Sequence, residues 1–140
     1  MINTLKDILK KHREIISYVI FGALTTLVDF VTYIFLTRVF SLNEDLANVF
    51  SQVVAIIFAF VVNKLYVFED KEKKLRAIIF QFLKFSSLRL ITLTLNSLIF
   101  FVMTEFTTIN DIIVKAFVSI IVIILNYIFS KLLVFKKTKE

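Results

Sequence analysis

The chain has 140 residues, 59% of them hydrophobic, whereas soluble domains carry about 45–50% apolar residues. Its mean hydropathy of +0.87 and its composition exclude a soluble enzyme built on a glycine-rich nucleotide loop, because Gly22 is the only glycine. Cysteine is absent, so disulfides and thiol chemistry are excluded. With a single histidine, His12, and no carboxylate cluster, we expect no metal site and no cofactor.

Four long apolar stretches follow one another along the chain, at about residues 15–40, 46–68, 78–103 and 112–135. Each is long enough to cross a hydrocarbon core, which requires about 20 helical residues. The first exceeds the about 7–15 residues of a signal-peptide core, so we expect it to be retained. Since proline is absent, we expect rather continuous helices. The sequence predicts an all-α membrane protein whose residues 1–140 form a single transmembrane domain.

The basic residues predict how these helices are oriented. Short loops rich in Lys and Arg stay cytoplasmic, and fifteen of the seventeen basic residues fall on one side, leaving Arg38 and Lys115 for the other. We therefore expect both termini in the cytoplasm, with anionic lipids as partners of the basic collar, and we expect no nucleic-acid partner despite the net charge of +6. The fifteen are Lys6, Lys10, Lys11 and Arg13; Lys64, Lys71, Lys73, Lys74, Arg76, Lys84 and Arg89; and Lys131, Lys136, Lys137 and Lys139.

An internal repeat relates the first pair of stretches to the second. A shift of 67 residues, without a gap, places Leu65, Val67 and Phe68 on Leu132, Val134 and Phe135. Two helices per repeat return the chain to the same side, so the repeats are parallel, as in one class of transporter folds. The alternative is a common origin of two hairpins that hold no site between them.

Polar residues recur at helical spacing within the stretches and predict a polar path through the membrane. The second and fourth stretches carry polar positions at Gln52 and Asn63, and at Ser119, Asn126 and Ser130. The alternative is that such residues only hydrogen-bond neighbouring helices together. The predicted path comprises Thr25, Asp29, Gln52, Thr92 and Asn96.

Asp29 is the most informative of these residues. It lies eleven residues beyond Tyr18, or about 16 Å along a helix, which is near the middle of a core about 30 Å thick. An ionised carboxylate there is costly, so Asp29 is expected to be protonated, to pair with a cation such as Arg89, or to face water. A buried structural hydrogen bond is the competing interpretation.

Four basic residues near the predicted inner interface form a candidate phosphate site: Lys64, Lys84, Arg89 and Lys131. Arginine in particular offers fork-like hydrogen bonding to phosphate. The alternative is that the lysines extend to the interface and do nothing else.

Several segments resemble the GtrA-like family of small four-helix membrane proteins over Tyr18 to Lys136. They are YVIFGALTTLVDF, VVNKLYVF, FLKFSSLRLITLTLN and NYIFSKLLVF. The most specific element, an Asn, a basic residue, two further residues, then Val or Thr and Phe, is matched by Asn63 to Phe68. The second copy departs from this pattern at Ser130, although Asn126 matches the family's preceding Asn.

The resemblance implies a non-catalytic role in cell-surface polysaccharide or teichoic acid glycosylation, in a bacterial cytoplasmic membrane. Members are thought to move a polyprenyl-phosphate-linked sugar to the outer leaflet, where a glycosyltransferase uses it. Asn63 and Asn126 would then join the four cations at the headgroup. Since four helices enclose little volume, we also expect a homo-oligomer.

Two other functions remain open from the residues. A small proton-coupled exporter of cationic drugs would use Asp29 as its proton carrier. Against this function, basic side chains such as Arg89 would repel a cationic drug in the pathway. A non-transporting partner would recruit or stabilise a membrane glycosyltransferase, by contact within the membrane or through the basic segment 71–76. We expect no catalytic residues, since no nucleophile, base and orienting group occur together.

Overall fold

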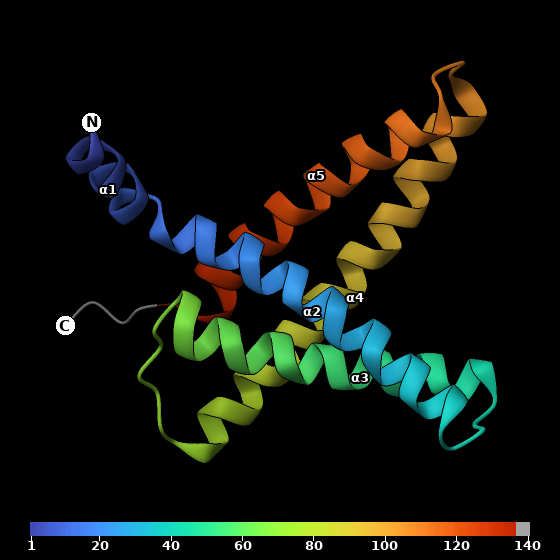
Figure 1. The fold of residues 1–140 in the computed structure, drawn as a ribbon, viewed down its shortest axis with the longest axis horizontal. Coiled ribbons are helices and arrows are strands. Elements are labelled where there is room, and N and C mark those ends of the chain that lie inside the picture. Colours follow the sequence, from blue (N-terminus) through green and yellow to red (C-terminus); the bar gives the residue numbers. More distant parts are fainter. Residues whose placement is uncertain (137–140) are drawn as a thin grey trace. The chain divides into compact units, whose positions relative to one another are not determined.

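The computed structural model describes residues 1–136, and within them the chain is all-helical with no strand (Figure 1). Four helical segments are long and apolar enough to cross a membrane, which confirms the predicted class of all-α membrane protein. The elements are α1 (Ile2–Lys11), α2 (Arg13–Arg38), α3 (Glu44–Val62), the π-helix η1 (Asn63–Val67), α4 (Leu75–Phe106), α5 (Asp111–Phe129) and the π-helix η2 (Ser130–Val134).

The elements divide into two compact units, residues 1–71 and 72–140, which we call unit 1 and unit 2. Unit 1 contains α1 and the hairpin of α2 with α3 and η1; unit 2 contains the hairpin of α4 with α5 and η2. In each hairpin we call the end with the connecting turn the turn end and the opposite end the open end. The π-helices begin at Asn63 and Ser130, which are 67 residues apart, as the sequence repeat requires.

The second helix of each hairpin begins at an asparagine cap. The side chain of Asn43 accepts a hydrogen bond from the backbone N–H of Asp45, and Asn110 accepts one from Ile112, both at 2.8 Å. These caps satisfy backbone donors that have no partner within the helix. Acidic residues in the first turns also suit the positive end of the helix dipole.

The second helix of each hairpin ends in a π-helix at the open end. The N–H of Phe68 donates to the carbonyl of Asn63 at 2.9 Å, and the N–H of Phe135 donates to Ser130 at 2.8 Å, in both cases across five residues. Both hairpins therefore remain helical to their ends, and the last turn of each second helix is a π-helix rather than an α-helix. The wider turn changes the direction of the side chains that come after the α-helix, and π-helical turns are frequent at functional sites.

An aromatic pair closes each open end at matching positions. The ring centroids of Tyr18 and Phe68 are 6.4 Å apart, and those of Phe85 and Phe135 are 6.2 Å apart. All four residues are buried. Tilted aromatic pairs at such distances add to the apolar burial that holds two helices together.

Small or β-branched residues line the inner face of each second helix. In α3 the buried residues every fourth position are Ala47, Ser51, Ala55 and Ala59. In α5 the matching residues are Val114, Val118 and Val122, which pack against Ile99, Phe100 and Met103. Small side chains let membrane helices approach closely. Accordingly, α2 and α3 are in closer contact along their length than α4 and α5, whose interface is lined by valine.

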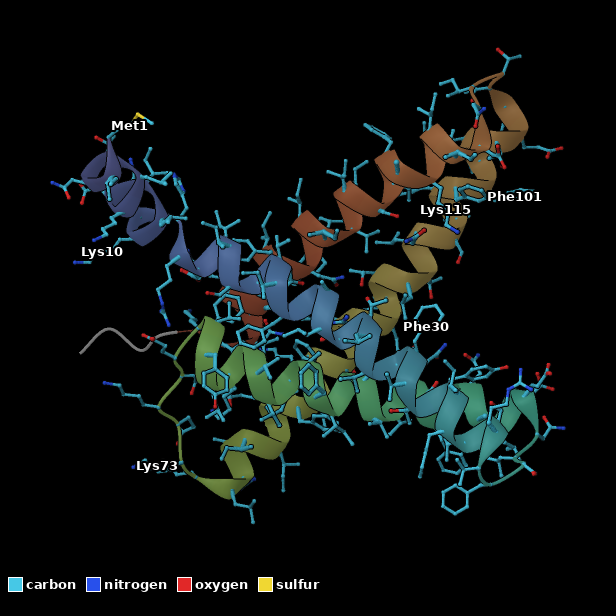
Figure 2. The ribbon with its side chains drawn as sticks, viewed as in Figure 1. Met1, Lys10, Phe30, Lys73, Phe101 and Lys115 are labelled. Atoms are coloured by element: carbon cyan, nitrogen blue, oxygen red, sulfur yellow. The ribbon has the colours of Figure 1, made fainter. Side chains whose placement is uncertain are left out.

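The outer surfaces of the hairpins are apolar. Phe30 on α2 is 62% exposed and Phe101 on α4 is 59% exposed, and both are labelled in Figure 2. In a bilayer such residues face lipid tails, so their exposure is compatible with a membrane-spanning hairpin and needs no buried partner.

Residues before α2 form a helix, where the sequence alone indicates only a charged tail. Helix α1 ends at Lys11, and His12 leaves the helical region with φ −106° and ψ 17°. Its ten residues are too short and too polar to stand out by hydropathy, which explains why the apolar stretches do not include it.

Candidate functional site

At the open end of unit 1, Lys64 is buried against an acidic partner. Its Nζ lies 2.8 Å from Oδ1 of Asp70, and the two side chains are only 8% and 9% exposed. Glu69 adopts a left-handed conformation with φ 48°, and the N–H of Asp70 donates to the carbonyl of Lys64 at 2.8 Å. This reversal brings Asp70 back onto the π-helix, so Lys64 has a counter-charge inside its own unit.

A second ion pair lies beside the first, closer to solvent. Arg13 contacts Glu69 at 2.8 Å, and both side chains are more than half exposed. The guanidinium also donates to the backbone carbonyl of Tyr66 at 3.3 Å, and the ring of Tyr66 stacks on Phe21 with centroids 5.7 Å apart. Two acidic residues thus neutralise two basic residues at this open end.

The open end of unit 2 carries the opposite charge at the matching positions. Lys136 stands where unit 1 has Glu69, and Lys137, which lies outside the described residues, stands where unit 1 has Asp70. Lys131 is exposed, with its Nζ 3.4 Å from the hydroxyl of Tyr127 and 5.6 Å from the centre of that ring. The π-helix is common to both units, whereas the two residues that follow the aromatic pair are acidic in unit 1 and basic in unit 2.

Lys84 and Arg89 extend this basic region along α4. Lys84 is exposed and lies 5.6 Å from the ring centre of Phe80, while the half-buried Arg89 lies 5.8 Å from that of Phe85. Aromatic faces stabilise such cations. In the described part of unit 2 the acidic residues are Glu72 at its start and Glu105 and Asp111 toward the turn end.

A shallow groove of about 530 Å³ lies along the first turns of α4. It combines two basic residues with apolar ones, which is the composition that suits a lipid headgroup beside its acyl chain. The lining residues are Lys74, Arg76, Ala77, Ile79, Phe80 and Leu83.

The polar positions of the predicted path differ between the units in what they contact. The buried Thr25 donates to the carbonyl of Phe21 on its own helix at 2.8 Å. The hydroxyl of Thr92, also buried, lies 2.9 Å from the carbonyl of Arg89 and 2.7 Å from Oδ1 of Asn126 on α5. Only unit 2 therefore has a threonine–asparagine contact between the helices at this level of the described chain.

Two polar oxygens of unit 1 are buried and have no hydrogen-bond partner among the described residues: Oδ1 of Asp29 and Oδ1 of Asn63. The amide nitrogen of Asn63 donates to the carbonyl of Ala59 at 2.6 Å, so only half of that amide is satisfied. Buried polar atoms are rarely left unpaired, and those that are call for a ligand, water or functional explanation. By contrast, Gln52 is exposed and Asn96 is half-buried.

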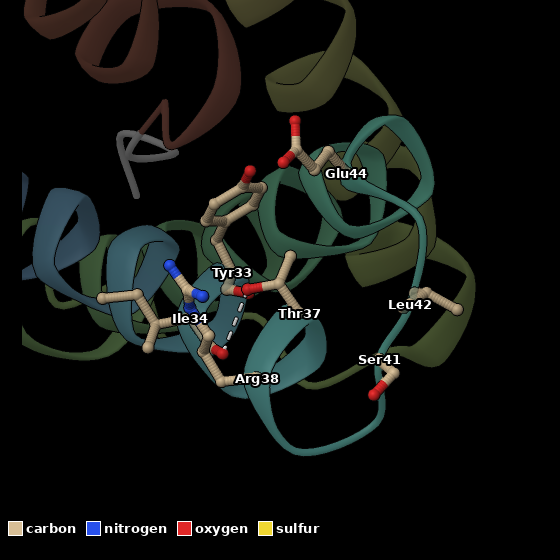
Figure 3. A pocket seen from close by; sticks show the side chains of 7 residues that line it. All are labelled: Tyr33, Ile34, Thr37, Arg38, Ser41, Leu42 and Glu44. Atoms are coloured by element: carbon tan, nitrogen blue, oxygen red, sulfur yellow. Dashed lines mark hydrogen bonds between the residues drawn. The ribbon is translucent and has the colours of Figure 1, made fainter.

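Sequence reasoning missed a pocket at the turn end of unit 1. Its volume is about 330 Å³, and its side chains are drawn in Figure 3, where Tyr33 and Glu44 reach in the same direction. The hydroxyl of Thr37 bonds back to the carbonyl of Tyr33 at 2.9 Å. The signal was the helical spacing of Tyr33, Thr37 and Arg38, although the charge of Arg38 by itself indicates only topology. The lining residues are Tyr33, Ile34, Thr37, Arg38, Ser41, Leu42 and Glu44.

These features define a multi-pass membrane protein made of two helical hairpins with unlike open ends. The family described as GtrA/DPMS, transmembrane domain, matches residues 17–135, and the chain belongs to it. The chain is 33% identical over 126 residues to the cell wall teichoic acid glycosylation protein GtcA of Listeria monocytogenes serovar 1/2a, covering 90% of this chain and 87% of that protein. It is 32% identical over 124 residues to the uncharacterized membrane protein YwcD of Bacillus subtilis, covering 88% and 97%.

Proposed function

We propose that this protein takes part in teichoic acid glycosylation by moving a polyprenyl-phosphate-linked sugar across the bacterial cytoplasmic membrane. The observation that carries the proposal is the surplus of positive charge at the open end of unit 2, in a chain related to teichoic acid glycosylation proteins. A phosphate or diphosphate is the part of such a lipid that basic side chains recognise.

Arg89 and Lys131 are the principal contacts that we propose for the phosphate, with Lys84 at the rim. Arg89 is half-buried and held by an aromatic face, so its guanidinium is oriented before a ligand arrives. Lys131 lies on the π-helix, which directs it differently from an α-helical residue. We also propose Lys64 and Asn63 of unit 1 as contacts of the headgroup, although Lys64 is already paired with Asp70.

The remaining polar positions would carry the sugar. Moving a sugar through hydrocarbon is costly unless polar groups replace water along the way. Asp29 supports this role because one of its carboxylate oxygens is buried and unsatisfied within the described residues. Thr92, Asn126 and Asn96 offer further hydroxyl and amide groups, while the apolar outer surface suits the polyprenyl tail.

The proposal includes no chemical step by this chain, so a membrane glycosyltransferase would act on the translocated lipid as a partner. We propose cytoplasmic open ends, which reporter fusions at Glu140 and near Asn43 would test. A homo-oligomer would enlarge the enclosed volume and is testable by native mass spectrometry, which would also identify co-purified lipids.

The direct test reconstitutes the full chain in proteoliposomes with a labelled polyprenyl-phosphate sugar and measures how much label reaches the opposite leaflet. The variant Lys84→Ala/Arg89→Ala/Lys131→Ala should transfer at least about tenfold more slowly, because charge-assisted hydrogen bonds contribute about 1.5–3 kcal/mol each. Lys115→Ala is the matched control, since it removes a cation from the turn-end half of unit 2 and should transfer normally.

Normal transfer by the triple variant would disprove the phosphate site. No transfer by the wild type, together with loss of glycosylation in cells lacking the protein, would favour a non-transporting partner of a glycosyltransferase. Drug resistance conferred by the wild type and lost in Asp29→Asn would instead favour a proton-coupled exporter.

A further inference from the structure

Helix α1 separates its apolar and charged residues onto opposite sides. Its apolar residues recur at spacings of three and four, which places them on one face of an α-helix, and they are between 48% and 73% exposed. This face consists of Ile2, Leu5, Ile8 and Leu9. The opposite face consists of Asn3, Thr4, Lys6, Asp7, Lys10 and Lys11, with a net charge of +2.

The helix is interrupted at His12, so the axis of α1 need not follow the axis of α2. In unit 2 the position that matches His12 is Ile79, which lies inside the uninterrupted α4. Unit 1 instead interrupts the helix, and Figure 1 shows α1 leaving the line of α2. Since α2 is a membrane-spanning candidate that starts at Arg13, α1 ends next to the start of that candidate span. At about 15 Å, α1 is too short to span the core itself.

We propose that α1 lies in the plane of the membrane surface, with its apolar face in the outer part of the acyl chains and its lysines among anionic phospholipid headgroups. An anionic lipid surface fits both faces at once: it covers four exposed apolar side chains and complements a net positive charge. The side chains of α1 extend freely from its ribbon in Figure 2, where Met1 and Lys10 are labelled.

The proposal gives α1 a mechanical consequence for unit 1. His12 is the only residue between α1 and Arg13, and Arg13 pairs with Glu69 at the open end. A helix anchored in the surface therefore fixes the height of this ion pair relative to the headgroups. Anchoring is independent of whether the protein moves a lipid-linked sugar.

The absence of cysteine allows a direct test on the full chain. Leu5→Cys places an environment-sensitive fluorophore on the apolar face, and Asn3→Cys is the matched control at the centre of the polar face. Each labelled protein is reconstituted in bilayers of phosphatidylglycerol and phosphatidylcholine that contain lipids with nitroxide-bearing acyl chains. Quenching of the Leu5→Cys label should exceed that of the Asn3→Cys label at least threefold.

The charge requirement is tested with Lys6→Gln/Lys10→Gln/Lys11→Gln in the Leu5→Cys background, because glutamine retains helix propensity. A basic residue near an anionic surface favours association about fivefold, or about 1 kcal/mol. The surface-bound population should therefore fall on the order of tenfold or more, and removing phosphatidylglycerol should act similarly on the parent protein. An unchanged signal in both cases would disprove recognition of anionic lipid.

Two other results would overturn the location. Equal quenching at both positions would mean that α1 has no preferred face toward lipid. A Leu5→Cys label that is shielded from water but not quenched by the nitroxide lipids would mean that protein, from another copy or from unit 2, covers the apolar face.

Discussion

At the open end of unit 1, Lys64 is buried against Asp70, whereas at the matching position of unit 2 the side chain of Lys131 is exposed beside Tyr127. The two positions share a π-helix, an aromatic pair one turn away and a register of 67 residues. They differ in the residues immediately after the aromatic pair, which are acidic in unit 1 and lysines in unit 2. One lysine is thus engaged in holding its own hairpin together, and the other belongs to a surplus of positive charge.

The comparison shows that a repeated backbone need not repeat its chemistry. The features common to both units are structural ones: an asparagine cap, a π-helix and an aromatic pair at matching positions. The differences are in polar and charged side chains at other matching positions, where Gly22, Asp29 and Ala59 of unit 1 correspond to Arg89, Asn96 and Asn126 of unit 2 in register. Polar and charged groups have diverged on two hairpins that fold alike.

The largest expected effect concerns the buried ion pair. Lys64→Ala or Asp70→Ala should each lower the free energy of unfolding by about 3–5 kcal/mol, because each leaves an uncompensated buried charge. The double variant Lys64→Met/Asp70→Leu should recover most of that loss, since apolar residues of similar size often replace a buried pair at little cost. Thermal unfolding in detergent measures all three.

Lys131→Ala is the matched control in unit 2 and should change stability by less than about 1 kcal/mol, because its side chain is exposed. Equal destabilisation by Lys64→Ala and Lys131→Ala would remove the distinction between the two open ends.

The next largest effect is expected on the rate of lipid transfer, where substitutions of Asp29 are compared with a substitution of Asn96. If Asp29 serves the sugar by hydrogen bonding, Asp29→Leu should slow transfer at least about tenfold, which is about 1.4 kcal/mol, while Asp29→Asn retains a substantial part. If its titration drives transport, Asp29→Asn should be as inactive as Asp29→Leu, since neither titrates. Asn96→Leu should have the smaller effect. The measurement is transfer of labelled lipid in proteoliposomes, and full activity of Asp29→Leu would leave this residue with a packing role only.

Hydropathy located the four membrane-spanning helices, and self-comparison of the chain located the repeat, because both depend on composition and spacing. The Lys64–Asp70 contact could not be foreseen, since Asp70 lies beyond the apolar stretch that ends at Phe68. The chain brings Asp70 back to Lys64 because Glu69 adopts a left-handed backbone conformation. Such a conformation is uncommon for residues other than glycine, so a glutamate at this position does not predict it. Helix α1 could not be found by hydropathy, because six of its ten residues are polar.

The candidate site was foreseeable in kind but not in detail. The basic residues of unit 2 could be identified from sequence, because charge near a membrane boundary is conspicuous. The contact of Thr92 with Asn126 could not, because it depends on the rotation of α5 against α4. The turn-end pocket likewise combines residues from α2, the turn and α3, which no single helical pattern brings together.

A smaller effect is expected on the free energy of unfolding when Thr92 of unit 2 and the matching Thr25 of unit 1 are substituted. Asn126→Leu or Thr92→Val should lower the free energy of unfolding by about 0.6 kcal/mol and at most about 1.7 kcal/mol, which are the mean and the maximum for hydrogen bonds between membrane helices. Thr25→Val should have less effect, because among the described residues the hydroxyl of Thr25 bonds to Phe21 of its own helix. A double-mutant cycle on Thr92 and Asn126 isolates their coupling, and additive losses would show that the two side chains do not interact.

The smallest effect concerns the exposed pair of Arg13 with Glu69, which lies beside the buried pair and provides a contrast in salt dependence. Arg13→Gln/Glu69→Gln should show a coupling at the low end of about 0.2–1 kcal/mol, since both side chains are more than half exposed. The coupling should vanish in 1 M salt, where the screening length falls to about 3 Å, while the coupling of Lys64 with Asp70 should persist. Glutamine at position 69 keeps a side chain of the same length, so the left-handed backbone there is strained equally in parent and variant. A coupling between Arg13 and Glu69 that survives high salt would mean that the open end of unit 1 excludes water around both ion pairs.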